Sequence, residues 1–198
     1  MLAEHIVYST ALAIIVGMLC LRYTGRDVSW IIIVLAWAPD TDLFISTLLR
    51  IVRFRHRFDG FTIVHGTFHN IAAMVIFAVV IMLILHPFGI RYLDAFVLSI
   101  IGFGAHLIED ALVYPHGYML LWPLYQSNVG LGWLLASANE ETYTADFFHI
   151  ANTQVLFIGL VLLLIAILIR ARYEGSGWIR YYLPEKVYQR YFAGDKVP

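Results

Sequence analysis

The chain has 198 residues, of which 61% are hydrophobic and only 14% are charged. Soluble domains are about 25% charged, so this composition excludes an ordinary water-soluble domain and predicts a single-domain integral membrane protein. The net charge of −1 argues against a nucleic-acid partner, and the single cysteine, Cys20, excludes an internal disulfide.

Five apolar stretches are long enough to cross a bilayer, which takes about 20 helical residues. They are residues 5–21, 28–49, 61–85, 93–113 and 148–169. The chain is therefore predicted to be all-α: a bundle of about five transmembrane helices over residues 1–170. An amphipathic juxtamembrane tail follows over residues 171–198, and its stretch EKVYQRYF combines aromatic and basic side chains.

The basic residues predict an orientation for this bundle. The second loop holds Arg50, Arg53, Arg55 and Arg57, whereas the other Lys and Arg side chains fall on the side of the tail. Since cytoplasmic loops carry the excess of Lys and Arg, we expect the tail to be cytoplasmic and the N-terminus to lie on the opposite side.

Ionisable residues interrupt every apolar stretch at one end. A carboxylate inside a bilayer costs about 2.5–3.5 kcal/mol on insertion scales, so each of them needs a compensating partner. Because successive helices alternate in direction, these ends all meet on one side of the membrane. The residues are His5, Asp40, Asp42, His65, His69, His106, Glu109, Asp110 and His149.

The spacing of these residues suits metal ligation. His65 and His69 share a face if they lie in the first turns of the third helix, as do His106 and Asp110 in the fourth. Pro39 should interrupt the second helix next to Asp40 and Asp42. Mixed nitrogen and oxygen donors without thiolate favour zinc, with manganese or iron(II) as alternatives. The predicted ligands are Asp40, Asp42, His65, His69, His106, Asp110 and His5, of which Asp40 and His106 are also the candidate catalytic residues.

The same residues carry a family resemblance. The four motifs are His5, PDTD at 39–42, HGTFHN at 65–70 and GFGAHLIEDALVYPHGYMLLWP at 102–123. Their order resembles that of the YdjM-like membrane-bound metal-dependent hydrolases. That family is described as LexA-binding and inner-membrane-associated, and the resemblance extends from about His5 to Pro123. It implies a metal-dependent hydrolase. In the middle motif the family's His-Arg-Gly is reduced to His65–Gly66, so His69 carries over better than His65.

We therefore expect a hydrolase that uses metal-activated water on a phosphoester or another amphipathic, lipid-like substrate, with membrane lipids as its surroundings. The main alternative is a metal-ion or proton transporter that uses intramembrane Asp and His side chains. There are two further alternatives. One is a haem protein in which paired histidines bind the haem iron, and the other is a protein whose metal only stabilises the fold.

Each residue also has a structural interpretation. Asp40 or Asp42 could cap the helix that resumes at Leu43, and His106 could simply pair with Asp110. Glu109 faces about 100° away from Asp110 on a helix, which favours an interfacial charge over a general base.

Overall fold

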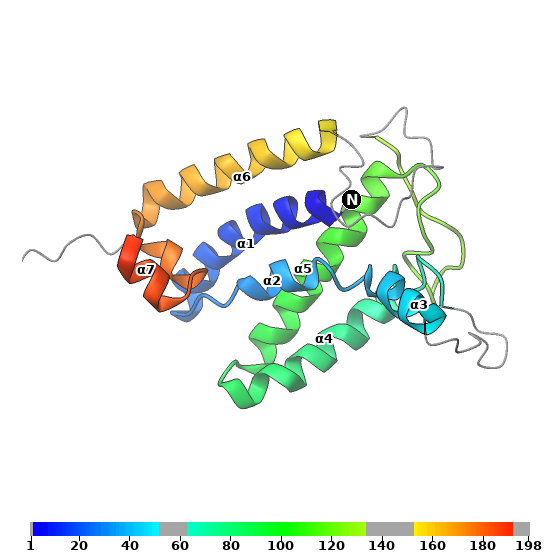
Figure 1. The fold of residues 1–198 in the computed structure, drawn as a ribbon, viewed down its shortest axis with the longest axis horizontal. Helices are drawn as coiled ribbons and strands as arrows, with labels where there is room; N and C mark the ends of the chain where they lie inside the picture. Colours follow the sequence, from blue (N-terminus) through cyan, green and yellow to red (C-terminus); the bar gives the residue numbers. More distant parts are fainter. Residues whose placement is uncertain (1, 52–62, 134–152, 192–198) are drawn as a thin grey trace, which may run out of the picture.

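The computed structural model describes residues 2–51, 63–133 and 153–191, and four long helices form its body (Figure 1). They are α1 (Leu2–Thr24), α4 (Ile71–Leu85), α5 (Tyr92–Val113) and α6 (Thr153–Glu174). The shorter elements are α2 (Trp30–Leu35), α3 (Thr41–Ile51), α7 (Glu185–Tyr191) and the 3₁₀ turns η1 (His86–Phe88) and η3 (Gly177–Tyr181). These three ranges contain helices and no β-strand, which confirms the all-α prediction.

The long helices pack as two pairs. α1 and α6 run side by side, and α4 and α5 form a hairpin through η1 (Figure 1). α2 packs against both α1 and α5 and contributes Ile31 and Ile32 to the main core. Gly102 of α5 permits this contact, because a Cβ there would stand 2.6 Å from the Ile32 carbonyl oxygen. The chain of α2 therefore lies directly against α5, one turn before His106.

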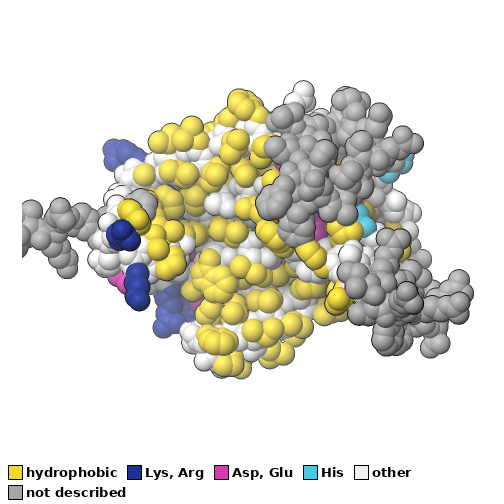
Figure 2. All heavy atoms as spheres, in the orientation of Figure 1, with side chains coloured by type: hydrophobic (Ala, Val, Ile, Leu, Met, Phe, Trp, Pro, Cys, Tyr) yellow, Lys and Arg dark blue, Asp and Glu magenta, His cyan; other side chains and the backbone are white. Residues whose placement is uncertain are grey.

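The outer faces of the long helices are apolar. Leu83 on α4 and Phe157 on α6 are exposed, as are many similar side chains around them. Figure 2 shows hydrophobic side chains across the middle of the molecule, with Lys and Arg at the end that carries α7. Four described segments are long and apolar enough to cross a membrane: Ala3–Thr24, Ile71–Phe88, Tyr92–Val113 and Gln154–Glu174. The helical membrane bundle predicted from composition is confirmed.

The second predicted stretch, residues 28–49, is not one continuous helix. α2 ends at Leu35, residues 36–40 form turns, and α3 begins at Thr41. Pro39 accounts for the break because it has no N–H to donate and its ring clashes with the preceding helical turn. The two residues before Pro39 adopt a 3₁₀-like turn, because the amides of Trp37 and Ala38 donate to carbonyl oxygens three residues earlier in the chain.

The third and fifth stretches also differ from their predicted bounds. α4 begins only at Ile71, where the Asn70 side chain accepts a hydrogen bond from the Ala73 amide and caps the helix. α6 is described from Thr153 and continues to Glu174, past the predicted end at residue 169. His149 lies outside the described residues. The division of the chain at residue 170 stays a prediction, and α7 confirms a helix over residues 185–191.

A buried polar cluster joins the tail to the bundle at the end opposite the N-terminus. Arg170 of α6 is fully buried and donates to Asp27 Oδ2 at 2.6 Å and to the carbonyl oxygen of Ile14 at 3.2 Å. Gly17 provides the space for this ion pair, because a Cβ at position 17 would stand 2.6 Å from Asp27 Oδ2. Burial raises the pKa of Tyr182 to about 12, so its phenol stays protonated and donates to the Ala13 carbonyl oxygen at 2.9 Å.

We expect Asp27→Asn to destabilise the protein strongly, because it removes the buried counter-charge of Arg170 and leaves only the more exposed Glu174 as its ion-pair partner. Breaking one partner of a buried ion pair costs about 3–5 kcal/mol. The measurement is the free energy of unfolding in detergent, followed by thermal or denaturant melting. The matched control is Asp94→Asn, which removes the partner of the surface residue Arg91 and should have a much smaller effect. Similar losses in the two variants would contradict the assignment of Arg170–Asp27 as the buried ion pair that secures α6 to the segment between α1 and α2.

Candidate metal site

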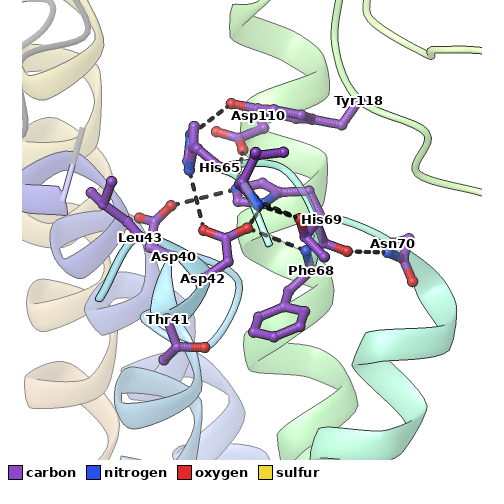
Figure 3. Close-up of polar contacts among 12 residues, drawn as sticks. Asp40, Thr41, Asp42, Leu43, His65, Phe68, His69, Asn70, Asp110 and Tyr118 are labelled. Atoms are coloured by element: carbon purple, nitrogen blue, oxygen red, sulfur yellow. Dashed lines mark hydrogen bonds and ion pairs between the residues drawn. The ribbon is translucent and has the colours of Figure 1, made fainter. Parts of the chain in front are cut away.

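Four separate segments deliver histidine and aspartate side chains to one buried cluster. Figure 3 labels Asp40, Asp42, His65, His69 and Asp110 of this cluster. α1 contributes one residue. The break before α3 and the first turn of α3 together contribute two, the segment before α4 contributes two, and the last turns of α5 contribute two. They are His5, Asp40, Asp42, His65, His69, His106 and Asp110, so the cluster contains all seven predicted ligands. His5, Asp42, His69, His106 and Asp110 are each at most 2% exposed.

His106 is held in one orientation by the broken second segment. Its Nδ1 lies 2.7 Å from the carbonyl oxygen of Ala36, directly after α2. A carbonyl oxygen can only accept, so Nδ1 carries a proton, and in the neutral form of the ring Nε2 presents a lone pair to the cluster. Nε2 faces His69 Nε2 at 3.3 Å and Asp110 Oδ2 at 3.4 Å. Such acceptor atoms repel one another unless a proton or a cation lies between them.

The distances among three of these atoms match the face of a metal-coordination tetrahedron. His69 Nε2 lies 3.3 Å from both His106 Nε2 and Asp110 Oδ2, and the third side is 3.4 Å. Zinc bonds of about 2.0–2.1 Å place tetrahedral ligands about 3.3–3.4 Å apart. Asp40 Oδ1 lies 3.4 Å from His69 Nε2 and 3.9 Å from His106 Nε2, so a fourth side chain, the second carboxylate, approaches the same pair of nitrogens.

His5 and Glu109 form the outer part of the site. His5 Nδ1 donates to Glu109 Oε2 at 2.8 Å, while His5 Nε2 faces Asp110 Oδ1 at 3.5 Å. The His5 ring stacks on His106 with the ring centroids 3.7 Å apart. A histidine ligand typically donates its second N–H to a carboxylate or carbonyl, as His5 and His106 both do here. The expectation of Glu109 as an interfacial charge is wrong, because its side chain is buried against α1.

His65 and His69 do not lie on one helical face as predicted. They belong to the turn segment before α4, where Gly66 has φ +92° and Asn70 is the helix cap. His69 nevertheless points into the centre of the cluster, whereas His65 is 21% exposed at its rim. Because irregular backbone rather than helix periodicity brings these residues in, their spacing could not have predicted their positions.

Asp42 ties this turn segment to α3 (Figure 3). Its carboxylate accepts from the Phe68 amide at 3.2 Å and lies 3.3 Å from His65 Nδ1. Burial opposes ionisation of Asp42, but the neighbouring His65 and His69 and the Phe68 amide hold the pKa of this carboxyl below its ordinary value. Asp42 thus reaches across to the His65–His69 segment, which disfavours its interpretation as a helix cap.

Tyr118 is a site residue that the sequence did not single out. Its hydroxyl lies 3.0 Å from His65 Nε2, and its ring packs on His69 with centroids 4.3 Å apart. Because His65 Nδ1 faces Asp42, an Asp42–His65–Tyr118 chain of polar contacts runs from the cluster to its rim. The stretch YPHGYMLLWP at 114–123 carried no signal for it beyond its place after the fourth helix.

Several buried polar atoms of the cluster lack a hydrogen-bond partner among the described residues. They include both carboxylate oxygens of Asp110 and Nδ1 of His69. Such atoms are rare in native structures and point to a missing ion or water. Three overlapping groups have ligand atoms close enough to hold a metal ion: His5–Asp40–His106, Asp40–His65–His69 and His69–His106–Asp110. The donor set therefore fits a divalent cation.

The fold and the cluster define a class: an α-helical integral membrane protein with a buried His/Asp site able to hold a metal ion. The chain matches the family model described as YdjM inner membrane protein over residues 1–176, and it belongs to that family. The match runs past Pro123, where the motif resemblance ended, and includes α6. No curated protein and no solved structure matches the chain.

We expect detergent-purified protein to contain about one or two equivalents of a divalent metal, which His106→Ala and Asp110→Asn each remove. The reason is that both residues supply a corner of the 3.3–3.4 Å triangle. The measurement is elemental analysis of purified protein before and after reloading with zinc, manganese or iron(II).

Two further variants test whether the loss of metal is specific to the residues of the cluster. Glu109→Gln should weaken metal affinity by about 10–100-fold in chelator competition, because it alters only the partner of His5 Nδ1. His86→Ala is the matched control: this histidine stacks on Tyr92 in the hairpin turn and should leave the metal content unchanged. Wild-type protein that stays metal-free after reloading would contradict the metal site.

Proposed function

We propose that this protein is an integral membrane metal-dependent hydrolase that acts on a phosphoester or another amphipathic, lipid-like substrate. The observation that carries the proposal is the His69–His106–Asp110 triangle. One of its two histidines, His106, is oriented by a hydrogen bond to the Ala36 carbonyl oxygen, which lies outside the triangle. Three protein ligands with a fourth position for water or substrate are typical of catalytic zinc, whereas structural zinc sites are closed. Asp40 Oδ1 approaches that fourth position, 3.4 Å from His69 Nε2 and 3.9 Å from His106 Nε2, so the proposal requires water or substrate to bind beside this carboxylate.

The donor set favours zinc among the divalent metals, with manganese or iron(II) as alternatives. A bound ion of this kind supplies Lewis acidity, which polarises the scissile group and makes water nucleophilic near neutral pH. His106, His69 and Asp110 would hold the ion, and Asp40 and His5 lie close enough to extend the set or to serve a second ion. Asp40 and His106 stay the candidate catalytic residues.

The side chains at the rim suit proton transfer. His65 is partly exposed and bridges the carboxylate of Asp42 and the hydroxyl of Tyr118. A histidine in this position can accept a proton at Nε2 and deliver it to a leaving oxygen, while Asp42 keeps the ring oriented through Nδ1. We assign this role to His65 in preference to direct ligation.

The position of the cluster supports an amphipathic substrate. It lies where α1 begins, where α5 ends and just before α4 begins, and each of these helices is a candidate membrane span. Ends of spanning helices lie near the lipid headgroups, so a substrate with a polar head and an apolar tail can present its head there without leaving the membrane.

Transport of a metal ion or proton is less well supported. A transporter needs polar groups along a path between the two membrane surfaces. In the described part of the chain, the core between the His/Asp cluster and the Arg170–Asp27 cluster is mainly apolar, with Ile31, Leu35, Leu98 and Phe103 among its buried residues. The buried polar side chains there include Ser9 and Ser99, which carry no charge.

The test is hydrolysis by the metal-loaded protein. We expect release of phosphate or headgroup from phospholipid–detergent micelles, followed by ³¹P NMR, to stop on chelation and to resume when metal is restored. His106→Ala and Asp40→Asn should abolish turnover, and His86→Ala should leave it intact. A fully metal-loaded protein without turnover on any phosphoester of a broad lipid panel would overturn the proposal in favour of a structural metal.

We further propose that the tail is cytoplasmic and that the His/Asp cluster lies toward the other face of the inner membrane, since Lys and Arg concentrate on the tail side. In a Cys20→Ser background, Glu185→Cys on α7 should resist a membrane-impermeant thiol reagent until cells are permeabilised. Asn128 is an exposed position on the side of the cluster, so Asn128→Cys should react with the same reagent in cells whose outer membrane alone has been permeabilised. The reverse labelling pattern would invert the orientation.

A further inference from the structure

A pocket of about 590 Å³ lies beside the cluster and is lined along one side by α4. Its volume is in the range of ordinary ligand pockets, about 300–1,000 Å³. At one end it contains His65 and Tyr118, the two side chains at the rim of the His/Asp cluster. At the other it follows α4 along Ala72, Ile76 and Phe77.

The two ends of this pocket differ in chemistry. The end beside the cluster offers His65, Tyr118, Asn70 and Asn128, all neutral or basic, and among the described residues no acidic one lines the pocket. The α4 end is apolar and continuous with the membrane-facing surface, because Ile76 is 62% exposed on a candidate spanning helix. A molecule bound here would have its polar part at the cluster and its apolar part toward lipid.

A larger cavity of about 810 Å³ lies between α1, α5 and α6, but it fits a different occupant. Among the described residues that line it, Tyr8 and Glu109 are the only ones with a polar or charged side chain, and Glu109 accepts a hydrogen bond from His5. A carboxylate at that end disfavours the phosphate of a lipid headgroup. The cavity along α4 therefore combines an apolar channel with a polar end that tolerates an anion.

We infer that the pocket along α4 binds one acyl chain of a membrane phospholipid and directs its phosphate-bearing headgroup toward His65, Tyr118 and the His/Asp cluster. This inference rests on the proposed function and specifies its substrate class and binding site. Gly66 contributes to the shape of the polar end, since a Cβ there would stand 2.9 Å from the Tyr118 ring. A side chain at position 66 would push Tyr118 and alter the entrance.

The test is photo-crosslinking of purified protein in nanodiscs of phosphatidylcholine and phosphatidylglycerol. The probe is a phosphatidylcholine with a diazirine in the middle of one acyl chain, and adducts are mapped by mass spectrometry. We expect adducts at Ile76, Phe77, Met119 and Trp122, which line the pocket from α4 and from the segment after α5.

Two variants fill the pocket, and one does not. Ala72→Trp and Ile76→Trp should lower crosslinking at Met119 and Trp122 about tenfold, which corresponds to about 1.4 kcal/mol of binding free energy. Leu83→Trp places the same side chain on exposed surface of α4 outside the pocket and should have no effect there. Ile76 is exposed, so its variant should fold even if Ala72→Trp does not.

Metal content of the same samples separates this inference from the proposed function. Loss of crosslinks with the metal retained supports an acyl-chain site beside an intact cluster. Crosslinks that are insensitive to Ala72→Trp and Ile76→Trp, or that map to Ile100 and Ile165 in the larger cavity, would overturn the inference. Protein that never binds metal but still shows these variant-sensitive crosslinks would overturn the hydrolase and leave the lipid site standing.

Discussion

The need to neutralise buried carboxylates governs the arrangement of this molecule. Asp40, Asp42 and Asp110 are taken out of water in a bundle whose surroundings are otherwise apolar. Each would be costly alone, and each lies within 3.5 Å of an imidazole nitrogen. Imidazoles can offset negative charge only when they carry a proton or share a cation. The hydrogen bond from His106 to Ala36 places a ring proton on Nδ1, so Nε2, which faces Asp110, can bind a cation when the ring is neutral.

This requirement explains the irregular backbone around the site. A continuous second helix would keep the Ala36 carbonyl in its own ladder of hydrogen bonds, but the break at Pro39 releases it to His106. A continuous third helix starting at residue 61 would hold His65 and His69 in regular register. The turn before Asn70 instead lets His69 reach the centre and leaves His65 at the rim beside Tyr118. The long helices determine where each segment lies, and the two interruptions bring the His and Asp side chains together in the cluster.

Alternation of helix direction was enough to predict which side chains meet, because it needs only the order of the apolar stretches. His5, Asp40, His69, His106 and Asp110 were found in this way. Glu109 was missed because its 100° offset from Asp110 was taken to point away from the site, whereas α1 passes on that side and places His5 between the two carboxylates. Tyr118 and the Ala36 carbonyl depend on loop geometry and on a broken helix, which hydrophobic periodicity does not encode.

The wide separation of the cluster residues along the chain has a consequence for biosynthesis. Asp40 and Asp42 leave the ribosome before His69, His106 and Asp110 exist, so the second segment first meets the membrane with its charges unmatched. The two short helices around the charged break are not among the candidate membrane spans, whereas α1, α4 and α5 are. We therefore expect the second segment to pack into the bundle only after α5 is made, since His69, His106 and Asp110 come later in the chain than Asp40 and Asp42.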